Sequence, residues 1–156
     1  MNIYDVIVVG GGHAGCEAAH ASARLGSKTL LITMKIDGIG QMSCNPAIGG
    51  IGKSHLAREV DALDGLMCKA ADDASLQSRV LNSSKGAAVR ATRIQTCRDE
   101  YKKAMQKDIL NHENLTVLQS TVKSVKFSKN RAEGVVIETG DYIKSKCVVL
   151  TAGTFL

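Results

Sequence analysis

The stretch "VVGGGHAGCEAA", residues 8–19, places three glycines in the pattern Gly10-x-Gly12-x-x-Gly15. An apolar run precedes this stretch, an alanine-rich segment follows it, and a second apolar run, "TLLIT", occupies residues 29–33. A buried strand, a glycine turn, a helix and a second buried strand in this order make a βαβ unit. The stretch therefore predicts an α/β fold built on a parallel sheet.

The three glycines have separate physical roles in such a turn. Gly10 allows the tight turn, Gly12 lets the backbone approach a pyrophosphate, and Gly15 lets the helix pack closely on the strand. The helix N-terminus offers N–H groups and a partial positive charge to the phosphates. We therefore predict that the turn Gly10-Gly11-Gly12-His13-Ala14-Gly15 binds a dinucleotide.

The end of the second predicted strand lacks the acidic residue that would bind a ribose hydroxyl. The chain has Thr33-Met34-Lys35 there. Lys35 leaves open a ribose 2′-phosphate, and hence NADP, although a solvated lysine is the simpler interpretation. His13 has no obvious carboxylate partner, so we interpret it as part of the cofactor loop rather than as a catalyst.

The remaining patterns predict further elements of the same sheet. Helices are expected over about 54–63, with Ser54 as a candidate N-cap, and over about 87–110. Apolar residues three or four apart mark one face of the long helix: Ile94, Cys97, Tyr101, Met105 and Ile109. Strands are expected over 115–118, 122–127, 133–138, "DYIKS" and 147–151. The predicted fold is a Rossmann-like FAD/NAD(P)-binding domain, with helices on both faces of a parallel sheet and an antiparallel β-meander.

The composition of the 156 residues favours one globular domain in the cytoplasm. Five cysteines without a C-x-x-C pair or zinc-ligand spacing indicate reduced thiols and no metal site. No signal peptide or membrane span is expected. The net charge of +5 weakly favours a polyanionic partner, whereas an aromatic content of 3% disfavours a base-stacking platform.

A second glycine-rich stretch, "SCNPAIGGIGKS" at residues 43–54, is close to a phosphate-binding P-loop. A P-loop follows directly on a buried strand, and no apolar run precedes Ala47. Ala47 also stands where the first glycine of that motif belongs. We therefore do not expect this stretch to bind a nucleoside triphosphate.

The last part of the chain resembles the flavoproteins that have two dinucleotide-binding domains. In these proteins a meander is followed by a strand like "VVLTAG", residues 148–153. The resemblance implies that Gly153 approaches the FAD pyrophosphate. It also implies that adenine bonds the backbone of the residue that opens the meander, which is Val122 here.

A more specific resemblance covers the whole chain. "GQMSCNPAIGGIGK" at residues 40–53, with "GGGHAG", "SKGAAVRATR" and "VVLTAGTFL", is similar to the N-terminal part of the glucose-inhibited division protein A (GidA, or MnmG) family. These are FAD-dependent enzymes that modify the wobble uridine of tRNA. Ser54 stands where glycine is usual in the family, and Ala87 where proline is usual.

The resemblance implies the cofactors and partners of the reaction. The family uses FAD, takes NADH as reductant and methylene-tetrahydrofolate as one-carbon donor, and acts with a GTPase of the MnmE (TrmE) type. It installs an aminomethyl or carboxymethylaminomethyl group on carbon 5 of uridine in tRNA. A homodimer is expected for the full-length form.

Cys44 is the expected catalytic residue, because a thiolate is a soft nucleophile suited to adding to carbon 6 of uracil. Its alternative role is that of a small buried hydrophobic residue. Gly49, Gly50 and Gly52 would let the loop backbone lie close to the isoalloxazine. Four basic residues are expected either to contact tRNA or cofactor phosphates or to form a solvated face: Lys53, Lys85, Arg90 and Arg93.

Members of the family run to several hundred residues, so we expect residues 1–156 to be the N-terminal part of an FAD-binding domain. An NADH-binding insertion and a C-terminal helical domain would lie outside it. Such a part is expected to bind FAD weakly or not at all and not to modify tRNA alone. The alternatives are a small-molecule flavin oxidoreductase, a relative of the folate- and FAD-dependent tRNA methyltransferase, and a cofactor-free interaction fragment.

Overall fold

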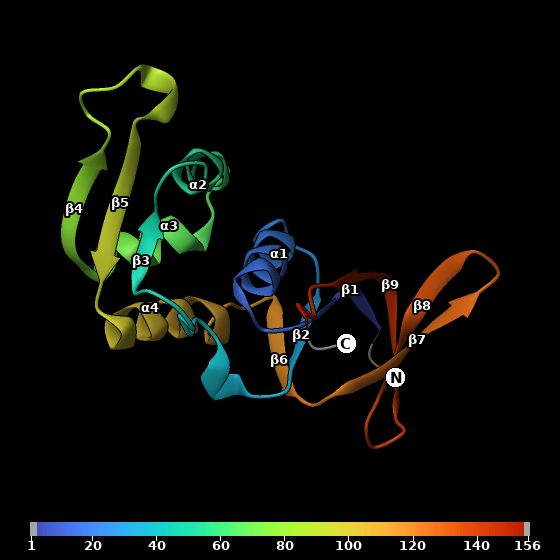
Figure 1. Cartoon of the computed structure of the whole chain (residues 1–156). Helices are drawn as coiled ribbons and strands as arrows, with labels where there is room; N and C mark the ends of the chain where they lie inside the picture. Colours follow the sequence, from blue (N-terminus) through green and yellow to red (C-terminus); the bar gives the residue numbers. More distant parts are fainter. Residues whose placement is uncertain (1–2, 155–156) are drawn as a thin grey trace. The chain divides into compact units, whose positions relative to one another are not determined.

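The computed structural model describes residues 3–154 and divides the chain into two compact units (Figure 1). One unit, here called the parallel-sheet unit, comprises the residues up to Ile39 and those from Asp108 onward. The other, the inserted unit, comprises Gly40–Lys107. The end of the "TAGTFL" motif, residues 155 and 156, lies outside the described residues.

The parallel-sheet unit contains the predicted βαβ motif. Strand β1 (Tyr4–Val9) pairs in parallel with β2 (Thr29–Thr33), and helix α1 (His13–Arg24) connects them. Strand β6 (Leu115–Gln119) continues the sheet in parallel beyond β2. The predicted glycine turn, its helix and the three parallel strands are therefore confirmed.

The antiparallel meander is also confirmed, with one correction. Strand β7 (Val122–Ser128) pairs with β8 (Arg131–Ile137), and the sheet order is β6-β2-β1-β9-β8-β7. The two separate strands expected over "DYIKS" and 147–151 are one continuous strand, β9 (Tyr142–Leu150). The strand is long because its first half pairs with β8 and its second half pairs in parallel with β1. Strand β9 thereby joins the parallel and antiparallel parts.

The core of this unit lies between strands of both kinds. Ile7, Leu30 and Ile32 from the parallel strands form one buried cluster with Val135 and Ile137 from β8. Burying side chains of this size stabilises the fold by about 1.5–3 kcal/mol each. The meander is thus packed into the sheet core rather than being a free hairpin.

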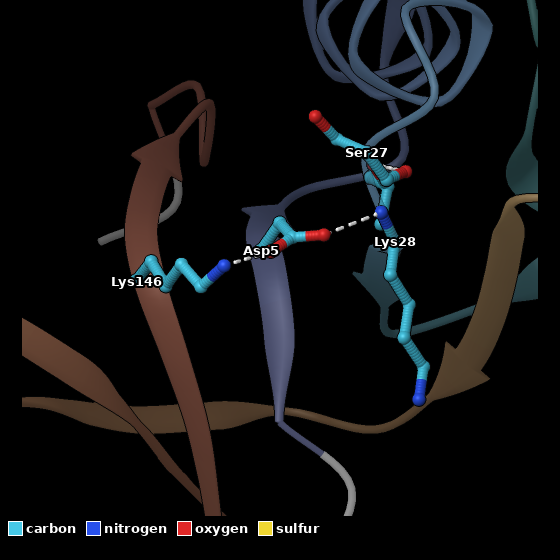
Figure 2. Close-up of polar contacts among 5 residues, drawn as sticks. Asp5, Ser27, Lys28 and Lys146 are labelled. Atoms are coloured by element: carbon cyan, nitrogen blue, oxygen red, sulfur yellow. Dashed lines mark hydrogen bonds and ion pairs between the residues drawn. The ribbon is translucent and has the colours of Figure 1, made fainter.

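Asp5 interrupts the apolar run of β1, and the structure supplies the reason (Figure 2). Its carboxylate accepts a hydrogen bond from the backbone N–H of Lys28, at 2.9 Å. It also forms an ion pair with Lys146 of β9, at 2.7 Å. Lys146 and the Lys28 N–H lower the pKa of Asp5 below its ordinary value. Asp5 therefore connects the start of β1 to the segments on both sides of it.

The inserted unit contains a three-stranded antiparallel sheet, in the order β3-β5-β4, which the sequence did not predict. Its strands are β3 (Ala47–Gly49), β4 (Ser75–Leu81) and β5 (Ala91–Thr96). Helices α2 (Lys53–Ala62) and α3 (Leu66–Asp73) pack on β3 and β5 (Figure 1). Two short 3₁₀ turns complete the connections, η1 (Ile36–Gly38) and η2 (Ala87–Val89).

The long helix expected over 87–110 is wrong in its first half. Helix α4 spans Arg98–Leu110, and the residues before it form β5. Tyr101, Met105 and Ile109 are fully buried, which confirms the predicted apolar face for the helix itself. Ile94 and Cys97 precede this helix. Residues Thr92, Ile94 and Thr96 alternate as in a strand, and pairing with β3 and β4 places them in β5.

The start of α2 also differs from the expectation. Gly52 is the N-cap, with φ at +77°, and Ser54 lies inside the helix and is buried. The candidate role of Ser54 as N-cap is therefore wrong. None of the helices between residues 3 and 154 is both long enough and apolar enough to cross a membrane.

Candidate functional site

The glycine turn between β1 and α1 is closed by contacts that only glycine allows. Gly10 has φ at +109°, in the region that favours glycine. A Cβ atom placed on Gly15 would lie 1.8 Å from the carbonyl oxygen of Gly10. The first turn of α1 therefore lies directly against the end of β1, as the predicted role of Gly15 requires.

Thr151 binds the same turn from the end of β9, a role that sequence analysis missed. Its hydroxyl shares its one proton between the carbonyl oxygens of Val9, at 2.9 Å, and Gly10, at 3.1 Å. Its backbone N–H also donates to the Val9 carbonyl, at 2.9 Å. The available signal was a hydroxyl residue directly before Ala-Gly at the end of a strand. Thr151 fixes the last strand to the turn.

Gly12 lies on the open side of the turn. It is exposed, it is the N-cap of α1, and a Cβ atom there would have no heavy atom within 4 Å. Gly11 is buried instead, and a Cβ there would lie 2.6 Å from the hydroxyl oxygen of Thr33. Because helix N-terminal N–H groups have no intrahelical acceptor, the open space at Gly12 suits a phosphate group.

The carboxyl ends of the parallel strands meet beside this turn. The backbone N–H of Ser120, after β6, donates to the carbonyl oxygen of Thr33 at the end of β2, at 2.9 Å. Lys35, just beyond Thr33, is exposed, and no ion pair is seen for it among the described residues. The simpler interpretation of Lys35 as a solvated lysine agrees with this position.

Two further predicted cofactor residues belong to the parallel-sheet unit. Gly153 is exposed two residues beyond Thr151, with φ at +67°, and a Cβ there would meet nothing within 4 Å. Val122 opens β7, is half-buried and pairs with Ile137. The structure thus connects Gly153 to the glycine turn through Thr151, whereas Val122 follows the β6 strand end through residues 120 and 121.

Burial lowers the pKa values of two histidines of α1. Burial lowers the pKa of His13 below its ordinary value of 6.5, and the carboxylate of Glu17 opposes this shift. A carboxylate therefore does act on His13, contrary to the sequence-based expectation. His20 is buried, and burial followed by the charge of His112 lowers its pKa as well. Its ring meets that of His112 edge-on, with centroids 5.7 Å apart.

The predicted nucleophile Cys44 belongs to the inserted unit. Its side chain is exposed, so the alternative role as a buried hydrophobic residue is not supported. The hydroxyl of Ser43 lies 3.9 Å from the Cys44 sulfur, and the guanidinium of Arg98 donates to the Cys44 carbonyl. The backbone N–H of Thr96 donates to the carbonyl of Pro46, at 2.8 Å. The loop backbone is therefore held at Cys44 itself and two residues after it, beside an accessible thiol.

The glycines after Cys44 shape the segment that resembled a P-loop. Gly49, Gly50 and Gly52 all have positive φ angles. A Cβ on Gly49 would lie 2.1 Å from the carbonyl of Thr92, and the Gly50 N–H donates to that same carbonyl, at 3.0 Å. No strand lies within residues 40–46, so this segment lacks the strand that a P-loop follows.

We expect Gly15→Ala to destabilise the fold by about 1–3 kcal/mol, because the new methyl group would overlap the Gly10 carbonyl. Gly12→Ser should change the free energy of unfolding by no more than about 0.5 kcal/mol, since serine is a good N-cap and the space is open. Urea unfolding followed by far-UV circular dichroism measures both. Equal stability of the two variants would contradict the close approach.

We expect the free energy of unfolding to fall as the pH decreases below 6.5, because His13 and His20 resist protonation only in the folded chain. Their contribution to the free energy of unfolding is fully present above pH 6.5, and it is lost as the pH falls from 6.5 to the lowered pKa values of the folded chain. Thermal unfolding between about pH 8 and pH 5.5 measures this. His20→Gln should reduce the pH dependence, whereas His55→Gln, at an exposed position, should leave it unchanged. If both variants showed the same dependence of stability on pH, the pH effect could not be attributed to His20.

Comparison with known proteins agrees with this geometry. The family model described as "Glucose inhibited division protein A" matches residues 5–156. Two crystal forms of Aquifex aeolicus GidA superpose with TM-scores of 0.94 and 0.96 at 48% identity. They cover 97% and 99% of this chain, which spans 25% and 26% of theirs.

A GidA-related protein from Thermus thermophilus is more distant, with a TM-score of 0.62 and 20% identity over 98% of this chain and 54% of that chain. That match shows a shared fold alone. The chain thus corresponds to about a quarter of the length of the Aquifex proteins. The coverage of the family model and the identity to the Aquifex proteins decide the assignment: the chain belongs to the glucose-inhibited division protein A family.

Proposed function

We propose that this chain forms the FAD-binding part of an enzyme that modifies the wobble uridine of tRNA. The observation that carries the proposal is the glycine turn, closed by Gly15 and Thr151 and open at Gly12, in a chain of the GidA family. The enzyme would use NADH and methylene-tetrahydrofolate and would work in the cytoplasm as a homodimer with a GTPase of the MnmE type. The product would carry an aminomethyl or carboxymethylaminomethyl group on carbon 5.

The residues of the parallel-sheet unit fit a dinucleotide such as FAD. The turn from Gly10 to Gly15 and the N-terminus of α1 would hold the pyrophosphate through backbone N–H groups. Gly153 would allow a second backbone segment to approach it, and the backbone of Val122 would meet the adenine. When bound, FAD would supply the redox chemistry that the transfer of a one-carbon unit requires.

Cys44 is proposed as the nucleophile of the inserted unit. Carbon 5 of uracil is a poor nucleophile until a group adds to the neighbouring carbon 6. Addition of the Cys44 thiolate to carbon 6 would make carbon 5 electron-rich and able to attack the one-carbon unit. Loss of the proton on carbon 5 would then expel the thiolate and restore the double bond between carbons 5 and 6. The exposed thiol and the restrained loop backbone around it support this role.

We expect Gly12→Asp to weaken FAD binding at least about tenfold, because the aspartate would place a negative charge where the pyrophosphate approaches. Aspartate is also a good N-cap, so the variant should remain folded. Titration of FAD into the apo form of the enzyme that contains this chain, followed by flavin fluorescence, measures the effect. Asn130→Asp is the matched control, because it adds the same charge in the exposed turn between β7 and β8. Equal affinities for all three proteins would reject the predicted dinucleotide site.

We expect Cys44→Ser to reduce wobble-uridine modification by roughly a hundredfold while FAD affinity stays unchanged, because a serine hydroxyl is a much poorer nucleophile. The assay uses the active enzyme that contains this chain, with mass spectrometry of the tRNA nucleosides. Cys147→Ser is the control, because Cys147 is also exposed. Normal modification by the Cys44→Ser enzyme would rule out the nucleophile role.

A further inference from the structure

The net charge of the chain is concentrated in one hairpin. The chain has 20 Lys and Arg residues against 15 Asp and Glu residues, a net charge of +5. Residues 74–98 contain no acidic residue and carry five of the basic ones, at Arg79, Lys85, Arg90, Arg93 and Arg98. The rest of the chain is therefore balanced. Four of these five cations lie on strands β4 and β5 and the loop between them, here called the basic hairpin (Figure 1), and Arg98 is the first residue of α4.

Two arginines of the basic hairpin face each other across the strands. In the antiparallel register of β4 and β5, Arg79 lies directly opposite Arg93. Directly opposed residues have Cβ atoms only about 4.5–5.5 Å apart, and like charges in this arrangement destabilise the sheet. Both arginines are exposed, and among residues 3–154 no carboxylate forms an ion pair with either. The opposed guanidinium groups thus lack an internal counter-charge.

These arginines lie on the open face of the inserted unit's sheet. The guanidinium of Arg58, in α2, donates to the hydroxyl of Thr92 at 2.8 Å, so the helices cover the Thr92 side. Because side chains alternate along a strand, Arg93 and Gln95 point to the other side. Gln77 lies opposite Gln95 in the same register, and both are exposed. The open face therefore carries two cations next to two neutral hydrogen-bonding side chains.

The loop of the basic hairpin extends this charged surface. The side-chain amide of Asn82 donates to the carbonyl of Val89, at 3.1 Å, and the guanidinium of Arg90 donates to the carbonyl of Lys85, at 3.0 Å. These two bonds brace the loop across its width and keep Lys85 and Arg90 together at its end. Arg98, by contrast, is already bonded to the Cys44 carbonyl.

We propose that the open face of the basic hairpin binds the phosphate backbone of RNA, with Arg79 and Arg93 as a paired phosphate contact and Lys85 and Arg90 as its continuation. Guanidinium groups match phosphate geometry, and a phosphate between the two arginines would remove their repulsion. No aromatic side chain lies within residues 74–98, so the surface would contact the phosphates of the RNA rather than stack on its bases. The choice of RNA as the polyanion rests on the proposed function.

The role of Arg79 and Arg93 in RNA binding is tested by removing their charges. The double variant Arg79→Gln/Arg93→Gln is compared with Lys123→Gln/Lys126→Gln, which removes the same charge from exposed positions on β7. The probe is a fluorescein-labelled, unmodified tRNA transcript, and fluorescence anisotropy is measured over a series of KCl concentrations. We expect the arginine variant to bind tRNA at least about tenfold more weakly than wild type. The slope of log K against log salt concentration should become shallower by an amount that corresponds to about one to two phosphate contacts. The lysine variant should stay within about twofold of wild type.

Two added measurements separate the outcomes. The arginine variant should melt at the wild-type temperature or above it, because the opposed charges are gone. Arg79→Lys/Arg93→Lys, which keeps both charges, should retain most of the salt dependence. Equal weakening of the arginine and lysine variants would overturn the proposal, because net charge alone would then explain binding.

The proposal and the proposed function can fail separately. Absence of tRNA binding by the wild-type chain would overturn the RNA surface, while the FAD titration with Gly12→Asp would still stand on its own. If the arginine variant lost FAD affinity and FAD displaced tRNA from wild type, the arginines would belong to a cofactor phosphate site and the RNA surface would again be rejected. Binding of tRNA with unchanged affinity in the arginine variant would reject the hairpin but leave RNA as a substrate.

Discussion

The parallel-sheet unit depends on how closely helix α1 approaches the end of strand β1. The space that a Cβ atom on residue 15 would need is occupied by the Gly10 carbonyl. That carbonyl also accepts the Thr151 hydroxyl, so the turn, the helix and the last strand meet at one point. With Gly10, Gly11 and Gly15 committed to internal contacts, Gly12 is left as the open position. The open position at which we propose that a phosphate binds thus results from tight packing around the rest of the turn.

Strand β1 is held at both of its ends by polar contacts that cross the sheet. At its start, Asp5 bonds the Lys28 backbone and pairs with Lys146. At its end, Thr151 bonds Val9 and Gly10. Both sets of contacts involve β9 or the residue after it, and β9 is also the strand that carries the meander. Because β9 is long enough to pair with both β1 and β8, it joins the antiparallel strands to the parallel sheet.

The two units offer different chemistry to phosphates. The glycine turn would use backbone N–H groups and a helix N-terminus, which need no net charge. The basic hairpin uses side-chain cations that lie opposite each other on an exposed sheet face. A structural conflict such as two opposed arginines is expected where binding rather than stability shapes a surface. The restrained backbone around Cys44 belongs to the same inserted unit as that hairpin.

Local sequence patterns predicted an element correctly wherever the spacing of the residues fitted only one kind of secondary structure. The glycine spacing predicted the turn and its helix, and continuous apolar runs predicted β1, β2 and β6, because buried parallel strands need apolar side chains on both faces. The segment over 91–96 was misassigned because Ile94 fits both a helical and an alternating pattern, and only pairing with β3 and β4 selects the strand. The neighbours of Thr151 mark it only as a hydroxyl residue before Ala-Gly at a strand end; they could not show what it bonds, since its partners, Val9 and Gly10, lie at the other end of the chain.

The sequence by itself thus determined the βαβ unit, the meander and the residues of the glycine turn. It also determined the family, through motifs that span the chain. The tertiary structure alone decided that β9 is one strand, that a second sheet exists and that Arg79 faces Arg93. The physical reason is the same in each case: strand pairing and register are set by hydrogen bonds between segments far apart in the chain, which no local period encodes.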